Sequence, residues 1–149
     1  MIEYNVLDIA KYFVESGVFL NHKKLQKMVY YAYSWYLVKN NTSVNNIKNR
    51  LFENRIEAWV HGPVCPDLYY AYNNNEIIVY KSKQIDKKTI EILNLIIETY
   101  GKYTGDQLER MTHIENPWMN AREGYSKYER SNKEIKDEDI YKFYSSKIA

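Results

Sequence analysis

The segment that most constrains the fold is KKLQKMVYYAYSWYLVK, residues 23–39. Its apolar side chains recur at helical spacing, and Asn21 stands just before it, where a capping residue is expected. The positions that carry this spacing are Leu25, Met28, Val29, Ala32 and Trp35. From residue 29 to residue 38 the segment is apolar or aromatic on nearly every side, which indicates a helix that is either central to the core or covered by a partner. We predict a central core helix.

Three lysines in this segment, Lys23, Lys24 and Lys27, lie beside Tyr30 and Tyr31. Basic and aromatic neighbours are one way to grip single-stranded nucleic acid. However, 21 Lys and Arg residues stand against 19 Asp and Glu residues, so the formal net charge is only +2, which disfavours a protein that works mainly by attraction to phosphates. We therefore predict that these lysines belong to a solvated polar face of the helix and that nucleic acid is not the partner.

Helix signals recur along the rest of the chain, and the 5 glycines and 3 prolines leave few breaks between them. Capping residues, prolines at first-turn positions and apolar stripes predict helices at 5–17, 23–39, 66–72, 86–101, 104–111, 116–121 and 137–144. The third of these begins at Pro66, and in the sixth Asn116 is the expected cap before Pro117. The expected fold is mainly α, a compact bundle of about six or seven helices in a single domain over residues 1–149.

Two short segments have the composition of strands. Residues 55–60 (RIEAWV) alternate in polarity, and residues 77–80 (IIVY) are rich in β-branched side chains. Between them His61-Gly62-Pro63 must turn, because the residue before a proline avoids the helical region. We expect a short two-stranded β element in which 77–80 pairs with 56–60.

Several compositional features bear on the compartment. No apolar run approaches the roughly 18 residues that a membrane span needs. The start, MIEYN, lacks the basic leader and apolar stretch of a secretory signal. The single cysteine, Cys65, excludes an internal disulfide framework and fits a reducing environment. We predict a cytoplasmic protein without a membrane partner.

His61 and Cys65 are the pair most suggestive of chemistry. They could contribute to a metal site, or to a Cys–His nucleophilic pair in which a helix N-terminus lowers the pKa of the thiol. A metal site needs further ligands and a nucleophilic pair needs an oxyanion hole, and the sequence supplies neither at short spacing. We expect His61 to hydrogen-bond its own turn and Cys65 to be a small buried apolar residue. No enzyme activity, cofactor or metal is predicted; a small metal- or Cys/His-dependent hydrolase remains an alternative.

Three blocks of sequence resemble the Panacea family, which includes SocA-like antitoxins and phage-associated, GepA-like proteins. The blocks are KLQKMVYYAYSW (24–35), IEAWVHGPVCPDLY (56–69) and LERMTH (108–113), the last followed by Pro117-Trp118 and Ala121-Arg122. Their spacing also fits, so the resemblance covers nearly the whole chain. The motif residues expected to have structural roles are Lys24, Leu25, Tyr31, Trp35, Ala58, Trp59, His61, Gly62, Pro63, Pro66, Leu68, Tyr69, His113, Pro117 and Trp118.

The resemblance implies an antitoxin that neutralises a cognate toxin encoded nearby through direct protein–protein binding. At least one SocA-like member acts as an adaptor that delivers its toxin to a protease, so a protease is a second implied partner. Regulation of its own operon by DNA binding is a further alternative. The family name predicts the role but not the toxin.

The aromatic residues of the motif blocks suggest both scaffold and interface. We expect Trp35, Trp59 and Trp118, one from each block, to meet in a single aromatic cluster. Aromatic side chains are also the usual anchors of interfaces. The candidate partner-binding residues are Tyr30, Tyr33, Tyr70 and Tyr72. Lys24 is expected to pair with a carboxylate or a helix end.

Overall fold

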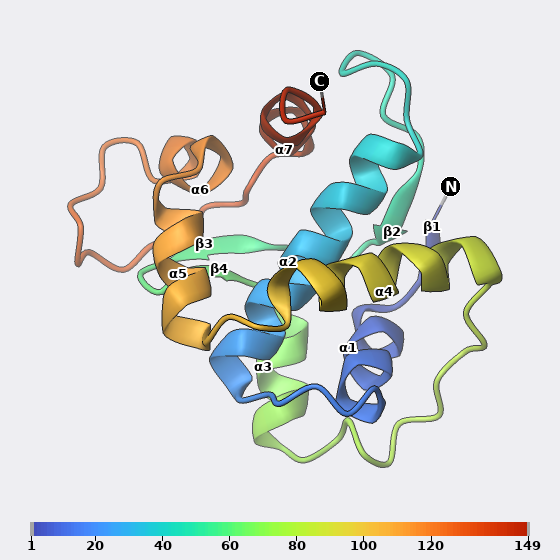
Figure 1. Cartoon of the computed structure of the whole chain (residues 1–149). Coiled ribbons are helices and arrows are strands. Elements are labelled where there is room, and N and C mark those ends of the chain that lie inside the picture. Colours follow the sequence, from blue (N-terminus) through green and yellow to red (C-terminus); the bar gives the residue numbers. More distant parts are fainter. Residues whose placement is uncertain (1, 149) are drawn as a thin grey trace.

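The computed structural model describes residues 2–148, and these form seven helices and four short strands (Figure 1). The helices are α1 (Val6–Glu15), α2 (His22–Lys39), α3 (Pro66–Asn73), α4 (Lys87–Tyr100), α5 (Gly105–His113), α6 (Asn116–Ala121) and α7 (Asp137–Ser145). The strands are β1 (Ile2–Tyr4), β2 (Arg50–Phe52), β3 (Glu57–Trp59) and β4 (Gly62–Val64). The predicted mainly α fold with about seven helices is confirmed.

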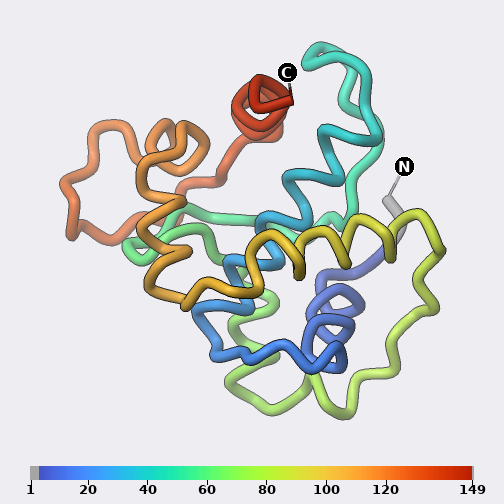
Figure 2. Tube along the Cα trace, viewed as in Figure 1, coloured from blue at the N-terminus to red at the C-terminus, as the bar shows by residue number. Residues whose placement is uncertain are grey.

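Helix α2 runs through the middle of the molecule, as predicted. It contacts α1, α3, α4, α5, α7, β2 and β4, and Figure 2 shows the two ends of the chain passing on different sides of it. The predicted polar face is wrong, because elements cover this helix on every side. Lys27 and Tyr30 each expose only 1% of their surface, and Ser34 exposes none. The hydroxyl of Ser34 bonds back to the carbonyl of Tyr30 (2.8 Å), which satisfies it without water.

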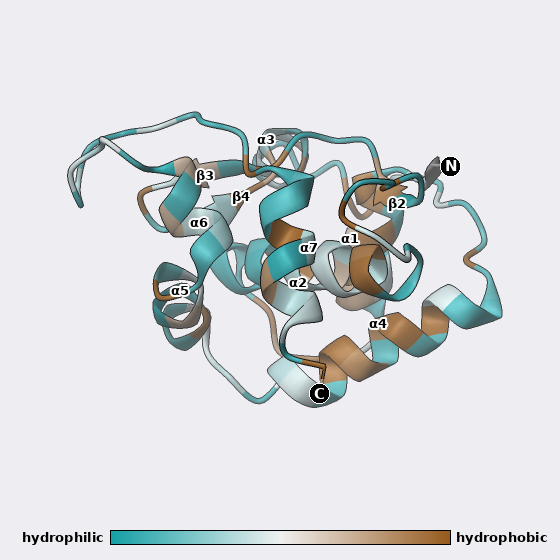
Figure 3. Cartoon of the chain, turned by 90° about the horizontal axis from the view of Figure 1, so that it is seen from above, coloured by the Kyte–Doolittle hydropathy of each residue, from teal (hydrophilic) through white to brown (hydrophobic). Residues whose placement is uncertain are grey.

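The helix starts follow the capping signals. Asn5 and Asp8 form a capping box at α1, and Thr104 and Gln107 form another at α5. The side chain of Asn21 accepts from the Lys24 amide at the start of α2 (2.9 Å). Figure 3 shows the hydrophobic residues of α4, whose cap is Asp86, in long stretches along the helix. Local side-chain capping therefore accounts for four of the seven helix starts in the described residues.

The two-stranded element differs from the predicted one. Strand β3 pairs antiparallel with β4 across a two-residue turn, in the register Trp59↔Gly62, while residues 77–80 form a turn in which Ile78 and Val79 are each 76% exposed. The expected pairing of 56–60 with 77–80 is wrong, because a tight hairpin closes a much shorter loop. Residues 133–135 flank β3 instead: Ala58 donates to the Lys133 carbonyl (2.9 Å). A second sheet pairs β1 with β2 in parallel.

A buried arginine holds the segment after α6 against β3. Arg122 is 5% exposed, and its guanidinium donates to the carbonyls of Ala58 (3.0 Å), Ser126 (3.0 Å) and Glu129. The guanidinium also lies over the Trp118 ring, 5.1 Å from the centroid. Because three carbonyls share its charge, Arg122 is satisfied while buried and fixes the turn that follows α6.

The three tryptophans do not meet in one cluster, so that expectation is wrong. Trp118 donates from Nε1 to the Trp59 carbonyl (2.8 Å), which joins the second and third sequence blocks. Trp35 packs instead on Tyr144 and donates to the Tyr100 hydroxyl (2.9 Å). Trp35 lies further along α2, where the helix is covered by α4 and α7 rather than by the hairpin.

A buried carboxylate organises the tyrosines around α2. Glu115 accepts from the hydroxyls of Tyr31 (2.9 Å) and Tyr144 (2.8 Å), and burial raises the pKa of its carboxyl above the ordinary value. The Tyr144 hydroxyl also lies 3.0 Å from that of Tyr30. Glu115, rather than the predicted Asn116, is the N-cap of α6 and makes no side-chain cap bond. Its carboxylate is taken by the tyrosines.

Glu115→Gln is expected to change the free energy of unfolding by no more than about 1 kcal/mol at pH 7, because the amide oxygen still accepts from both hydroxyls. Glu115→Ala should cost about 2–3 kcal/mol, since two buried hydroxyls lose their acceptor. The raised pKa means that the folded state holds the Glu115 proton more tightly. The free energy of unfolding of the wild type should therefore fall as the pH rises above 4.5. The part of this fall that is due to Glu115 should be absent from the glutamine variant. Urea unfolding between pH 4 and pH 7 measures it; equal damage from both substitutions would contradict the arrangement.

Candidate functional site

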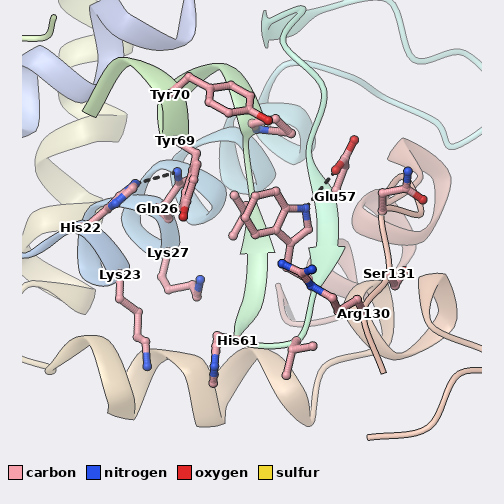
Figure 4. Close-up of a pocket in the computed structure, with 15 residues that line it drawn as sticks. His22, Lys23, Gln26, Lys27, Glu57, His61, Tyr69, Tyr70, Arg130 and Ser131 are labelled. Atoms are coloured by element: carbon pink, nitrogen blue, oxygen red, sulfur yellow. Dashed lines mark hydrogen bonds between the residues drawn. The ribbon is translucent and has the colours of Figure 1, made fainter. Parts of the chain in front are cut away.

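A cavity of about 960 Å³ lies beside the β3–β4 hairpin (Figure 4). We call it the hairpin cavity. Its walls come from the start of α2, the hairpin, the start of α3 and residues 130–132 before α7. The lining residues are His22, Lys23, Gln26, Lys27, Glu57, Trp59, Val60, His61, Val64, Pro66, Tyr69, Tyr70, Arg130, Ser131 and Asn132. Its volume is in the range of ligand-binding and anchor pockets.

Lys27 lies in the α2 wall, beneath the hairpin. It is 1% exposed, and its ammonium donates to the Pro63 carbonyl (3.1 Å). Burial lowers the pKa of Lys27 to about 7, although the nearby carboxylate of Glu109 acts in the opposite direction. Gly62 makes room for this side chain: its φ is +109°, and a Cβ there would stand 2.7 Å from the Lys27 Cε. The motif glycine is thus required by both backbone angle and close approach.

Gln26 holds the backbone of Cys65, which connects β4 to α3. Its amide oxygen accepts from the Cys65 N–H (2.9 Å), and its amide nitrogen approaches both the Cys65 carbonyl (3.4 Å) and the His22 ring (3.3 Å). Cys65 is 2% exposed, and burial raises the pKa of its thiol to about 12. The helix N-terminus that follows Cys65 was expected to lower the pKa of the thiol, but desolvation is the stronger effect.

An ionic network joins the mouth of the cavity to α5. Glu109 accepts from Lys23 (2.6 Å) and from His61 Nδ1 (3.0 Å), and Lys23 also reaches Asp106 (2.9 Å). Burial acts to raise the pKa of Glu109, but the bonds from Lys23 and His61 outweigh it and lower the pKa. His61, whose side chain is 70% exposed, therefore contacts α5. The expected bond to its own turn is replaced by this longer-range pair.

The opposite wall is aromatic and carries one exposed cation. The Trp59 indole donates to Glu57 (2.9 Å) and packs on Tyr69 at 5.0 Å between centroids. Arg130 is exposed and lines the same cavity (Figure 4). None of the ion pairs among the described residues involves Arg130. This part of the wall combines a planar apolar surface with an unbalanced positive charge.

The structure separates the four candidate interface tyrosines. Tyr70 is 61% exposed at the cavity rim, and Tyr72 is half-buried with its ring stacked on His22. Tyr30 and Tyr33 expose only 1% and 6%, so placing them on a free surface was wrong. They are buried because α7 and β2 cover the far side of α2.

The remaining motif residues mostly support the walls. Lys24 donates to the Gly101 carbonyl (2.6 Å), a helix end as expected. His113 stacks on Trp118 at 3.9 Å behind the hairpin.

Within residues 2–148 no three His, Cys, Asp or Glu side chains are grouped to hold a metal ion. In the same range, no helix combines the length and apolar character that a membrane crossing requires.

The model of the antitoxin SocA-like, Panacea domain matches residues 25–119. The chain belongs to this family. The matched part of the Panacea domain runs from the first turn of α2 into α6, and it includes the whole β3–β4 hairpin and α3. No curated protein and no solved structure matches the chain significantly.

The Panacea match and the cavity overlap only in part. Lys27, Trp59, His61 and Tyr69 lie inside the matched range, whereas Arg130 lies outside it, with its neighbours at 131–132. The α2 wall and the hairpin are therefore shared with the family model, and the loop before α7 adds a wall that the family model does not describe.

Proposed function

We propose that this Panacea domain neutralises a cognate toxin, encoded nearby, by binding it directly. The observation that carries the proposal is the family match over residues 25–119. It is supported by the chemistry of the hairpin cavity, which exposed Tyr70 and Arg130 line together with Trp59. Tyrosine, tryptophan and arginine are the residue types that most often anchor interfaces.

Binding rather than catalysis accounts better for the residues at the site. A hydrolase built on His61 and Cys65 would need a reactive thiolate, yet Cys65 is 2% exposed and its pKa is raised to about 12. The Gln26 amide holds the Cys65 backbone in place, which suits a scaffold position. We assign no catalytic residue, cofactor or metal to the domain. We propose that the chain forms a single domain and that it acts on the toxin in the cytoplasm.

Co-expression tests the proposal. The protein encoded next to this chain should arrest growth when induced alone, and growth should recover when this chain is induced with it. The two proteins should also co-purify. A neighbour that is toxic but is neither rescued nor bound would overturn the proposal for that pair.

The fate of the toxin distinguishes occlusion from delivery to a protease. If the toxin is merely covered, its half-life after translation arrest should be unchanged by this chain. A half-life shortened only in the presence of this chain would indicate an adaptor role. A mobility-shift assay with the promoter fragment at physiological salt tests the DNA-binding alternative; the modest net charge of +2 predicts no retardation.

A further inference from the structure

We propose that the hairpin cavity receives an acidic side chain of the toxin, held between Lys27 and Arg130, while an adjacent apolar group of the toxin packs on the aromatic wall formed by Trp59, Tyr69 and Tyr70. This inference rests on the proposed function and adds the binding site and the chemistry of the partner segment.

The charges around the cavity leave two cations without a dedicated carboxylate. Lys23 is paired with both Asp106 and Glu109, and Glu57 is paired with Arg55 (2.8 Å). Lys27 has only the electrostatic influence of Glu109, which is already shared by Lys23 and His61. Arg130 has no ion pair among the described residues. An anion is therefore the complementary group.

Lys27 also has unused hydrogen-bonding capacity. Its ammonium carries three N–H donors, and the Pro63 carbonyl is the one acceptor that the described residues offer within bonding distance. A buried ammonium with one bond is costly to maintain. A carboxylate entering from the cavity would supply both countercharge and further acceptors, and so would offset that cost.

The aromatic wall favours an apolar neighbour for this carboxylate. Trp59 packs on Tyr69, and Tyr69 meets Tyr70 edge-on at 5.8 Å between centroids. Tyr70 is 61% exposed and stands at the rim, where a partner can cover it. Desolvated aromatic and arginine side chains are typical hot spots.

The sheet edges favour side-chain insertion over strand addition. The outer side of β4 is occupied by α2, because Lys27 bonds to the Pro63 carbonyl and Gln26 bonds to the Cys65 amide. The outer side of β3 is occupied by residues 133–135. Within the described residues both outer edges of the hairpin are thus occupied, which favours recognition of the partner through its side chains over strand addition.

The test compares variants of the full chain for binding to the toxin by titration calorimetry. Arg130→Glu should raise the Kd at least about tenfold, because it places a negative charge opposite the acidic group. Tyr70→Ala should raise it about tenfold through lost aromatic contact. The control is Lys87→Glu, the same charge reversal at the start of α4, far from the hairpin in Figures 1 and 3; its Kd should stay within about twofold of wild type.

The partner residue can be identified by charge exchange. Each Asp and Glu of the toxin is changed to Lys, and the variant that loses binding to wild type but regains it with Arg130→Glu marks the inserted side chain. Circular dichroism melting of each variant confirms that it is folded. If wild type binds but both cavity variants bind equally well, the inference fails and the proposed function stands. If wild type does not bind, the proposed function itself fails.

A competing reading is a site for a free small anion. Benzoate, an aromatic carboxylate, serves as the probe in thermal-shift measurements. A rise in Tm that Arg130→Glu abolishes, together with unchanged toxin affinity in that variant, would overturn the inference in favour of a small-molecule site. Displacement of bound toxin segments by benzoate, with the same Arg130 dependence, would support it.

Discussion

Arg122→Ala is expected to lower the free energy of unfolding by about 4–5 kcal/mol, near the upper limit for single substitutions. The guanidinium serves three carbonyls, those of Ala58, Ser126 and Glu129, and all three lose a charged donor at once. The Trp118 ring loses the cation above it as well. Thermal unfolding followed by circular dichroism should show a Tm reduced by about 10–15 °C.

The matched control is Arg110→Ala on α5, where the arginine is exposed. Its effect should stay within about 0.5 kcal/mol, as for most surface substitutions. Arg122→Lys should be intermediate, because a lysine keeps the charge but cannot reach three divergent carbonyls. A Tm within 2–3 °C of wild type would correspond to a loss of less than about 1 kcal/mol in the free energy of unfolding. That result for Arg122→Ala would show that the guanidinium does not hold the loop against β3.

The effect of Lys27→Met on the free energy of unfolding is expected to change sign with pH. Burial lowers the folded-state pKa of Lys27 to about 7, from the value of 10.5 that is ordinary for an exposed lysine amine. Below pH 7 the wild type must keep a buried charge, so methionine, which is similar in length and apolar, should be the more stable residue. Above pH 10 the wild-type amine is neutral and retains its bond to Pro63. Methionine loses that bond and should be less stable by about 1 kcal/mol.

The direction follows from proton linkage. Between pH 7 and 10.5 the unfolded chain binds the Lys27 proton and the folded chain does not, so this group makes stability rise with pH, by at most about 1.4 kcal/mol per unit. The difference between wild type and Lys27→Met in urea unfolding isolates it from other titrating groups. Lys88→Met, the same substitution at an exposed position of α4, is the matched control. A constant difference for Lys27→Met would mean that the amine is solvated.

The elements that the sequence predicted well are those with local causes. Asn5, Asn21 and Thr104 cap helices through bonds to backbone amides two or three residues away, and such caps can be recognised from a few consecutive residues. The central position of α2 could also be predicted, because a helix that is apolar all round has no polar face to expose to water. The partner of β3 was not predicted, although it lies only a two-residue turn away, because Gly62-Pro63-Val64 contains a proline and lacks the composition of a strand.

The site was only partly predictable. The hairpin residues Trp59, His61 and Gly62 were singled out, but Lys27 was assigned to a solvated face because lysines usually are. The signal that pointed the other way was already present: no solvated face is available on a helix covered all round. Arg130 had no signal at all, because a charged residue in a polar loop is common and its place in the cavity wall follows from tertiary packing.

Helix α7 has a consequence for how the protein is made. It is synthesised after every other element described, yet it supplies Tyr144 to the Glu115 cluster and covers the far side of α2. Until residues beyond 144 have left the ribosome, Tyr30 and Tyr31 lack their packing against Tyr144, and that surface stays open to chaperones and degradation. If the proposed function holds, toxin binding therefore requires that synthesis has passed residue 144, and cleavage in the exposed stretch at 126–130 should loosen α7 and expose the same tyrosines.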